Sequence, residues 1–195
     1  PMSLNLSPIV AGAWRLADWH LSPAERLRWI EELVELGVTT FDHADIYGGY
    51  TVEALFGEAL ALAPALRRRL QLVSKCGIGL VTPARPQHRV KHYDTSAAHV
   101  RASVDRSLQN LRTDHLDLLL IHRPDPLMDA DELADAFQRL RNEGKVRQFG
   151  VSNFRPSQLR LLQSRIGLVT NQIELSPLHR APLHDGTLDQ CQELG

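Results

Sequence analysis

Five apolar segments of this chain each end in a polar side chain that could take part in chemistry. They are TTFD (ending at Asp42), LQLVSK (Lys75), DLLLIH (His122), FGVSN (Ser152 and Asn153) and LVTNQ (Gln172). A stretch with helical character separates each segment from the next. In a parallel barrel the active site lies where the strands end, on the loops that lead into the helices. The pattern therefore predicts that these side chains converge on one ligand.

The residue types in this group suggest acid–base chemistry. A tyrosine is a weak acid at neutral pH, with a pKa of about 10 in water, and a nearby ammonium lowers the pKa of such a phenol. Lys75 is the candidate cation, and Asp42 could keep it charged if it is buried. Tyr47 lies five residues beyond Asp42, and His122 could orient a carbonyl or help to hold the tyrosine proton. These residues predict an enzyme that protonates a carbonyl oxygen, and by themselves they do not reveal a hydride.

Strand-like and helical patterns alternate along the whole chain. The predicted strands are Ile9–Ala11, Val38–Asp42, Leu70–Ser74, Leu116–Ile121, Val146–Val151 and Leu168–Gln172. The predicted helices run from the capping residue Ser22 to Gly37, over Thr51–Leu62, from Asp94 or Thr95 to Leu111, from Asp129 or Asp131 to Gly144, over Pro156–Ser164, and over Thr187–Gly195. Such alternation is typical of parallel pairing with right-handed crossovers.

Two α/β architectures fit this alternation, an open doubly wound sheet and a closed barrel. The doubly wound sheet usually has a Gly-rich turn after its first strand, and the turn Gly12-Ala13-Trp14 does not match that fingerprint. We therefore expect a (β/α)8 barrel, which needs about 250 residues. About six β/α units are present, so residues 1–195 are predicted to form a single partial barrel domain. Because natural proteins avoid bare sheet edges, we expect the chain to be an incomplete copy of a longer polypeptide.

Composition excludes several classes of function. The formal net charge of −1 gives no broad field that would attract nucleic acid or an anionic membrane. No apolar run is long enough for a transmembrane helix. Cys76 and Cys191 make no disulfide framework, which fits a reducing compartment and a cytoplasmic location. His88 and His92 have no cysteine or carboxylate at ligand spacing, so no metal site is predicted.

The segment between residues 76 and 93 is a long connection rich in glycine and proline. Connections of this kind in compact domains are usually lids or binding loops. Its charged residues Arg85, Arg89 and Lys91 could favour anionic substrates or could simply be solvated. We call the end of the barrel at the carboxyl ends of the strands the mouth. Asp45 is expected to point into the mouth, as Tyr47 is, and has no assigned role.

Several segments resemble motifs of the aldo-keto reductase family. The resemblance covers residues 8–195 and is closest to the bacterial short-loop branch, with the chain truncated before the last two barrel strands. The matching segments are FDHADIYG (residues 41–48), Val-Ser-Lys ending at Lys75, Leu-Ile-His-Arg-Pro around His122, FGVSNF (149–154), Asn171-Gln172, and Gly12-Ala13-Trp14 after the first strand. Together these motifs are specific, although each alone would be weak.

The resemblance implies an NADPH-dependent reductase of aldehydes or ketones, with a small-molecule carbonyl substrate and no Rossmann motif. It implies that Tyr47 is the general acid, that Asp42 holds Lys75 beside it, and that His122 orients the carbonyl. The residues that it places at the cofactor are Gly12, Trp14, Ser152, Asn153 and Gln172. In the family the last two strands hold the pyrophosphate and the 2′-phosphate, so the choice of NADPH over NADH comes entirely from the resemblance. The oligomeric state is not indicated.

Two other functions stay open from the sequence. One is a nicotinamide-binding sensor or regulatory subunit with little turnover, a role that some members of the family have. The other is an unrelated barrel that transfers a proton next to a carbonyl.

Overall fold

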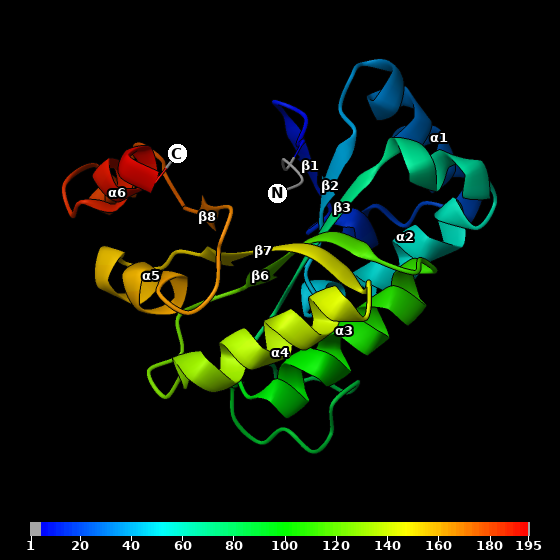
Figure 1. Cartoon of the computed structure of the whole chain (residues 1–195). Coiled ribbons are helices and arrows are strands. Elements are labelled where there is room, and N and C mark those ends of the chain that lie inside the picture. Colours follow the sequence, from blue (N-terminus) through cyan, green and yellow to red (C-terminus); the bar gives the residue numbers. More distant parts are fainter. Residues whose placement is uncertain (1–4, 195) are drawn as a thin grey trace.

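Six parallel strands form the main sheet of the computed structural model, which describes residues 5–194 (Figure 1). In spatial order they are β1 (Val10–Gly12), β2 (Thr40–Asp42), β3 (Gln71–Cys76), β6 (Leu116–Ile121), β7 (Val146–Ser152) and β8 (Asn171–Gln172). This order follows the chain without a reversal, whereas a doubly wound sheet reverses its strand order at a switch point. The predicted partial (β/α)8 barrel is therefore confirmed as the fold, and the doubly wound alternative is excluded.

Helices follow the strands in the predicted order. The α-helices are α1 (Pro23–Glu35), α2 (Val52–Leu60), α3 (Ala97–Leu111), α4 (Ala130–Asn142), α5 (Pro156–Gln163) and α6 (Thr187–Leu194). The short 3-10 helices are η1 (Leu16–Trp19), η2 (Tyr47–Gly49), η3 (Pro64–Arg69) and η4 (Ala181–Leu183). Helices α3 and α4 contact each other and run along β6 and β7 (Figure 1). The predicted domain limits, Pro1 and Gly195, lie outside the described residues, as does the predicted end of the last helix at Gly195.

The strands present two different faces, because successive side chains of a strand point in opposite directions. On one face Leu72, Leu119 and Phe149 belong to the large hydrophobic core that also contains side chains of the helices. On the other face Val73, Leu118 and Leu120 form a small separate cluster. Lys75 lies two residues after Val73 and His122 two residues after Leu120. Alternation therefore directs both polar side chains to the inner face of the barrel, away from the helices.

The connection after β3 is partly ordered rather than structureless. Strands β4 (Ile78–Gly79) and β5 (His92–Tyr93) pair antiparallel, and a further bridge joins Thr82 to Arg85. We call residues 78–93 the flap. It lies directly beyond the carboxyl end of β3, where the strand ends carry the predicted site residues.

Gly57 is needed for the close contact of α2 with α3. A Cβ at this position would lie 2.0 Å from the carbonyl oxygen of Asn110, so Gly57→Ala would force the two helices apart. We expect a loss of about 1–3 kcal/mol in the free energy of unfolding, measured by urea denaturation. Gly167→Ala is the matched control, because a Cβ there meets nothing within 4 Å. It should stay within about 1 kcal/mol of the wild type, and equal losses in both variants would contradict the packing argument.

Candidate active site

Lys75 is the centre of a hydrogen-bonded group at the carboxyl ends of β2 and β3. Its Nζ lies 2.7 and 2.6 Å from the two carboxylate oxygens of Asp42, 3.0 Å from the carbonyl oxygen of His43 and 3.1 Å from Tyr47 Oη. Lys75 is 2% and Asp42 8% exposed. An ammonium has three protons to donate, and these three partners account for all of them. The buried charge is therefore both paired and fully hydrogen-bonded, as a buried ion requires.

The Tyr47 hydroxyl accepts a hydrogen bond from Lys75 and keeps its own proton for another partner. Among the described residues none accepts that proton. The phenol ring has its centroid 5.9 Å from that of His122 and 6.4 Å from that of Trp14. The structure thus brings Asp42, Lys75, Tyr47 and His122 together, as the sequence predicted, with the phenol oxygen beside the ammonium and the phenol ring beside the imidazole.

His122 is a neutral imidazole at physiological pH. Burial, and secondarily the charges of Lys75, Arg123 and Lys91, lower its pKa to about 3. Its backbone nitrogen donates to the carbonyl oxygen of Cys76 at 2.9 Å, which fixes the residue just beyond β6. None of the described residues offers a hydrogen-bond partner to its Nδ1. A neutral ring with an unused nitrogen is suited to orient a polar ligand without adding charge.

Three residues at the ends of β7 and β8 form a second polar group. Asn153 has φ 54° and its backbone nitrogen donates to the carbonyl oxygen of Gln172 at 2.9 Å. The Asn153 side chain donates to Ser152 Oγ at 3.2 Å and accepts from the Glu174 backbone nitrogen at 2.7 Å. Ser152 is buried and Gln172 is exposed. Hydroxyl and amide groups both donate and accept, so this set fits a carboxamide such as that of nicotinamide.

The turn after β1 borders the same mouth. Gly12 pairs with Asp42, and a Cβ at Gly12 would have nothing within 4 Å. The next residue, Ala13, donates its backbone N–H to the Asp42 carbonyl oxygen at 2.9 Å. Trp14 is 66% exposed, although its ring lies close to Tyr47. This arrangement leaves an aromatic face available beside the phenol.

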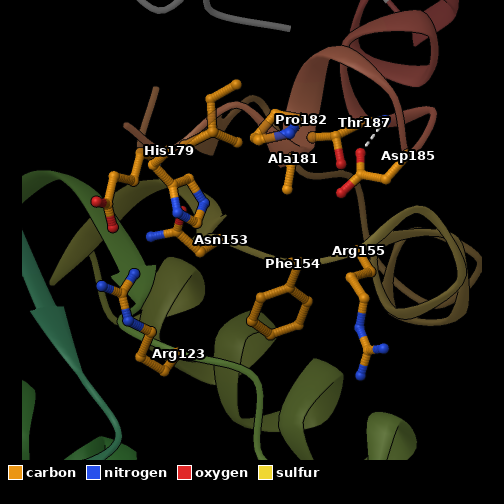
Figure 2. A pocket seen from close by; sticks show the side chains of 11 residues that line it. Arg123, Asn153, Phe154, Arg155, His179, Ala181, Pro182, Asp185 and Thr187 are labelled. Atoms are coloured by element: carbon orange, nitrogen blue, oxygen red, sulfur yellow. Dashed lines mark hydrogen bonds between the residues drawn. The ribbon is translucent and has the colours of Figure 1, made fainter. Parts of the chain in front are cut away.

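We call Ser152, Asn153 and Gln172 the amide group. A pocket of about 420 Å³ lies next to it, over the loops that follow β6, β7 and β8. In Figure 2 the side chains of Arg123, Asn153 and His179 come from these loops and surround the hollow. The other lining residues include Phe154, Arg155, Glu174, Pro182 and Thr187. Because Asn153 belongs to both the amide group and this lining, the pocket continues the candidate site along the barrel mouth.

Asp45 does not face the mouth, so that expectation was wrong. Its carboxylate accepts a short hydrogen bond from Ser103 Oγ on α3, and its backbone nitrogen donates to the Lys75 carbonyl oxygen at 3.0 Å. Burial, and secondarily the charge of Glu53, raise the pKa of Asp45 to about 7, against the hydrogen bond from Ser103. The carboxyl therefore holds the loop of Tyr47 from the helical side.

His43 was missed by sequence reasoning. It is fully buried, and its ring contacts that of Phe56 edge-on at 4.5 Å. Burial, and secondarily the charge of Lys75, lower its pKa to about 3. The alternation of side chains could have located it, since His43 lies two residues after the core residue Phe41 and on the same face. Its contribution to the site is the carbonyl oxygen that accepts from Lys75.

The raised pKa of Asp45 predicts a pH-dependent loss of stability. Well below about pH 4 this carboxyl is protonated in both the folded and unfolded states. As the pH rises to about 7 the unfolded chain loses the proton while the folded chain keeps it, so stability falls by up to about 4 kcal/mol. Asp45→Asn removes this contribution. The free energy of unfolding of Asp45→Asn, relative to the wild type, should therefore rise between about pH 4 and pH 7 in urea titrations; a constant difference would contradict the assignment.

Other site types find no support in the described residues. No group of three or more His, Cys, Asp or Glu side chains in residues 5–194 could hold a metal ion, and the His88 and His92 rings contact each other edge-on at 4.9 Å. Cys76 and Cys191 are free thiols. In the same range, no helix combines the length and the apolar character needed to cross a membrane.

Comparison with known sequences gives one consistent assignment. A sequence profile described as the Aldo/keto reductase family matches residues 8–195. The chain is 60% identical to oxidoreductase YdhF of Escherichia coli, over all of this chain and 65% of that protein. It is 51% identical to a 6-dehydroglucose reductase of Agrobacterium fabrum, over 97% of this chain and 65% of that protein. The chain thus spans just under two thirds of the length of these relatives.

Solved structures agree with the sequences. The chain is similar to a glycerol dehydrogenase from Gluconobacter oxydans, with a TM-score of 0.83 and 30% identity over 96% of this chain and 57% of that one. An aldo-keto reductase from Bacillus halodurans gives a TM-score of 0.80 and 28% identity over 97% of this chain and 59% of that one. Profile, relatives and structures lead to one conclusion: the chain belongs to the aldo/keto reductase family.

Proposed function

We propose that this chain carries the catalytic centre of an NADPH-dependent reductase that converts aldehydes or ketones into alcohols. The observation that carries the proposal is the contact of Lys75 Nζ with Tyr47 Oη at 3.1 Å, beside the carboxylate of Asp42. A positive charge at this distance stabilises the negative charge that appears on a phenol oxygen when its proton leaves. This arrangement suits the donation of a proton at neutral pH.

Each residue of the proposed site has a distinct task. Tyr47 donates its proton to the substrate oxygen, and Lys75 stabilises the phenolate that remains. Asp42 keeps Lys75 charged in a buried position. His122, being neutral, orients the carbonyl through a ring nitrogen toward the Tyr47 hydroxyl. NADPH, when bound, would supply the hydride that no side chain can donate.

The residues that would contact the cofactor lie in the amide group and in the turn after β1. Ser152, Asn153 and Gln172 would hold the nicotinamide carboxamide, while Gly12 and Trp14 would border the ring and the substrate. The fit of this donor and acceptor set supports the assignment. The preference for NADPH over NADH rests on the family resemblance, and a cytoplasmic location remains the expectation from the free thiols.

The substrate class is suggested by a relative. A protein 51% identical to this chain is named a 6-dehydroglucose reductase. We therefore propose aldehyde-bearing sugars as the first substrates to test. One panel should contain these sugars together with simple aldehydes and ketones. It should include 6-dehydroglucose, the substrate in the name of that relative.

The proposal is tested by following the loss of reduced-nicotinamide absorbance with this panel. We expect NADPH consumption with at least one aldehyde. NADPH should also quench tryptophan fluorescence, and Trp14→Phe should remove much of this quenching because Trp14 borders the mouth. Absence of both signals would contradict the proposal.

The second candidate function is a nicotinamide-binding sensor or regulatory subunit with little turnover. Tight NADPH binding without oxidation across the panel would favour that role over the reductase. The unrelated barrel enzyme is excluded, because the chain belongs to the aldo/keto reductase family.

A further inference from the structure

Tyr50 has a backbone conformation that side chains rarely adopt. Gly48, Gly49 and Tyr50 follow Tyr47 with φ of 59°, 65° and 76°. Glycine tolerates this left-handed region, but for a bulky residue it is an outlier. Such a conformation persists only when its surroundings hold it, and it often marks a functional position. The turn directs the Tyr50 side chain away from η2 and toward the flap.

Tyr50 makes its side-chain hydrogen bonds and its ring contact with residues of the flap. Its hydroxyl accepts from the Leu80 backbone nitrogen at 2.9 Å and donates to the Ile78 carbonyl oxygen at 3.4 Å. The guanidinium of Arg85 lies over the ring, 4.4 Å from its centroid. Tyr50 thus connects the loop that carries Tyr47 to three separate points of the flap.

The flap itself is held together by contacts within it. His88 Nδ1 lies 2.9 Å from the Leu80 carbonyl oxygen, and the His88 ring contacts that of His92. A Cβ at Gly79 would come within 2.4 Å of the His92 ring, which shows how closely the two arms pack. These contacts connect the two arms of the flap, so one external attachment can position both.

The flap also reaches the neighbourhood of the proposed catalytic group. It begins three residues after Lys75, and the charge of Lys91 on its returning arm acts on His122. The flap therefore extends from the Lys75 side of the mouth toward the His122 side.

We propose that Tyr50 is a positioning residue that holds the flap against the loop of Tyr47, so that the flap forms one wall of the substrate pocket. The attachment of the flap is independent of the reaction, whereas the role as a pocket wall rests on the proposed reductase function. The two parts have separate readouts.

Limited trypsin digestion tests the attachment without any need for activity. The flap offers cleavage after Arg89 and Lys91, while Arg85 precedes Pro86 and resists trypsin. Tyr50→Phe removes the hydroxyl and leaves the ring for Arg85, so the fold should survive, as urea denaturation can verify. We expect cleavage in the flap to become roughly tenfold faster, the factor for losing the hydroxyl's hydrogen bonds.

Tyr93→Phe is the matched control. It removes a hydroxyl from the same flap, but Tyr93 is 41% exposed and its hydroxyl makes no hydrogen bond among the described residues. Cleavage should then match the wild type. Equal cleavage rates in Tyr50→Phe and Tyr93→Phe would overturn the attachment.

Kinetics test the pocket wall. With an aldehyde that the wild type reduces, Tyr50→Phe should raise KM roughly tenfold and leave kcat within about twofold, because Tyr47 itself is untouched. Faster flap cleavage with an unchanged KM would overturn the proposal that the flap is a wall of the substrate pocket. A roughly tenfold fall in kcat would mean that Tyr50 acts on Tyr47 instead. If the wild type reduces no carbonyl compound, the proposed function fails, and the digestion still decides whether Tyr50 holds the flap.

Discussion

Tyr47→Phe should lower the turnover of carbonyl reduction by about 10²–10⁴-fold, the usual contribution of a positioned general acid. The substitution removes the hydroxyl that Lys75 contacts, and it keeps the ring that lies near Trp14 and His122. Cofactor affinity should change little, because the proposed carboxamide contacts come from β7 and β8. Steady-state NADPH oxidation and a fluorescence titration measure the two quantities separately.

The control for this prediction is again Tyr93→Phe, which removes a phenol hydroxyl that makes no hydrogen bond among the described residues. Tyr93 belongs to the flap, whose proposed effect is on KM, so kcat should match that of the wild type. Unchanged turnover in Tyr47→Phe would mean that a different group protonates the substrate, and the reaction mechanism would have to be rebuilt. A parallel loss of NADPH binding would instead show that the phenol is part of the cofactor site.

Lys75→Met should destabilise the protein by about 3–5 kcal/mol, because it leaves the Asp42 carboxylate buried without its partner. Asp42 is 8% exposed, and both its carboxylate oxygens accept from the Lys75 ammonium. The free energy of unfolding from urea denaturation at neutral pH measures the loss. The His43 carbonyl oxygen also loses a donor in this variant.

The double variant Asp42→Asn/Lys75→Met separates lost charge pairing from lost packing. It contains no buried unpaired charge, so it should recover a large part of the stability lost by Lys75→Met. Its turnover should nevertheless remain low, because no cation then stabilises the Tyr47 phenolate. A double variant as unstable as Lys75→Met would indicate that packing around the lysine stem, rather than the ion pair, is the main contribution.

The strand order and the predicted grouping at the mouth could be read from the sequence because both depend on local patterns. Alternating apolar segments and helices gave the six strands, and the position of Asp42, Lys75 and His122 at the strand ends placed them at one edge. The shorter observed strand at β8 shows the limit of this reading. The segment Leu168–Gln172 is strand-like in composition, but regular strand is confined to Asn171–Gln172. The preceding residues still bond to β7, since the Val169 nitrogen donates to the Phe149 carbonyl oxygen at 2.9 Å and the Thr170 carbonyl oxygen accepts from the Val151 nitrogen at 3.0 Å. Composition located the segment, and the fit to the neighbouring strand set the exact ends of β8.

Residues whose roles depend on distant partners could not be read in this way. The orientation of Asp45 is determined by Ser103, which lies 58 residues further along the chain. The hydrogen bonds of Tyr50 with the flap join residues 28 and 30 positions apart. No rule of sequence spacing relates such pairs. The sequence therefore indicated only that residues 76–93 form a long connection and that Asp45 is a carboxyl without an assigned role.

The sequence by itself therefore determined the family, the parallel α/β architecture and the set of groups at the strand ends, because periodicity and short motifs are local properties of the chain. The tertiary structure alone decided which of those groups share protons, which carboxyl turns away from the mouth and how the flap is held. These outcomes depend on distances and burial that arise only when remote segments pack together, and burial decides whether an ionisable side chain is charged or neutral.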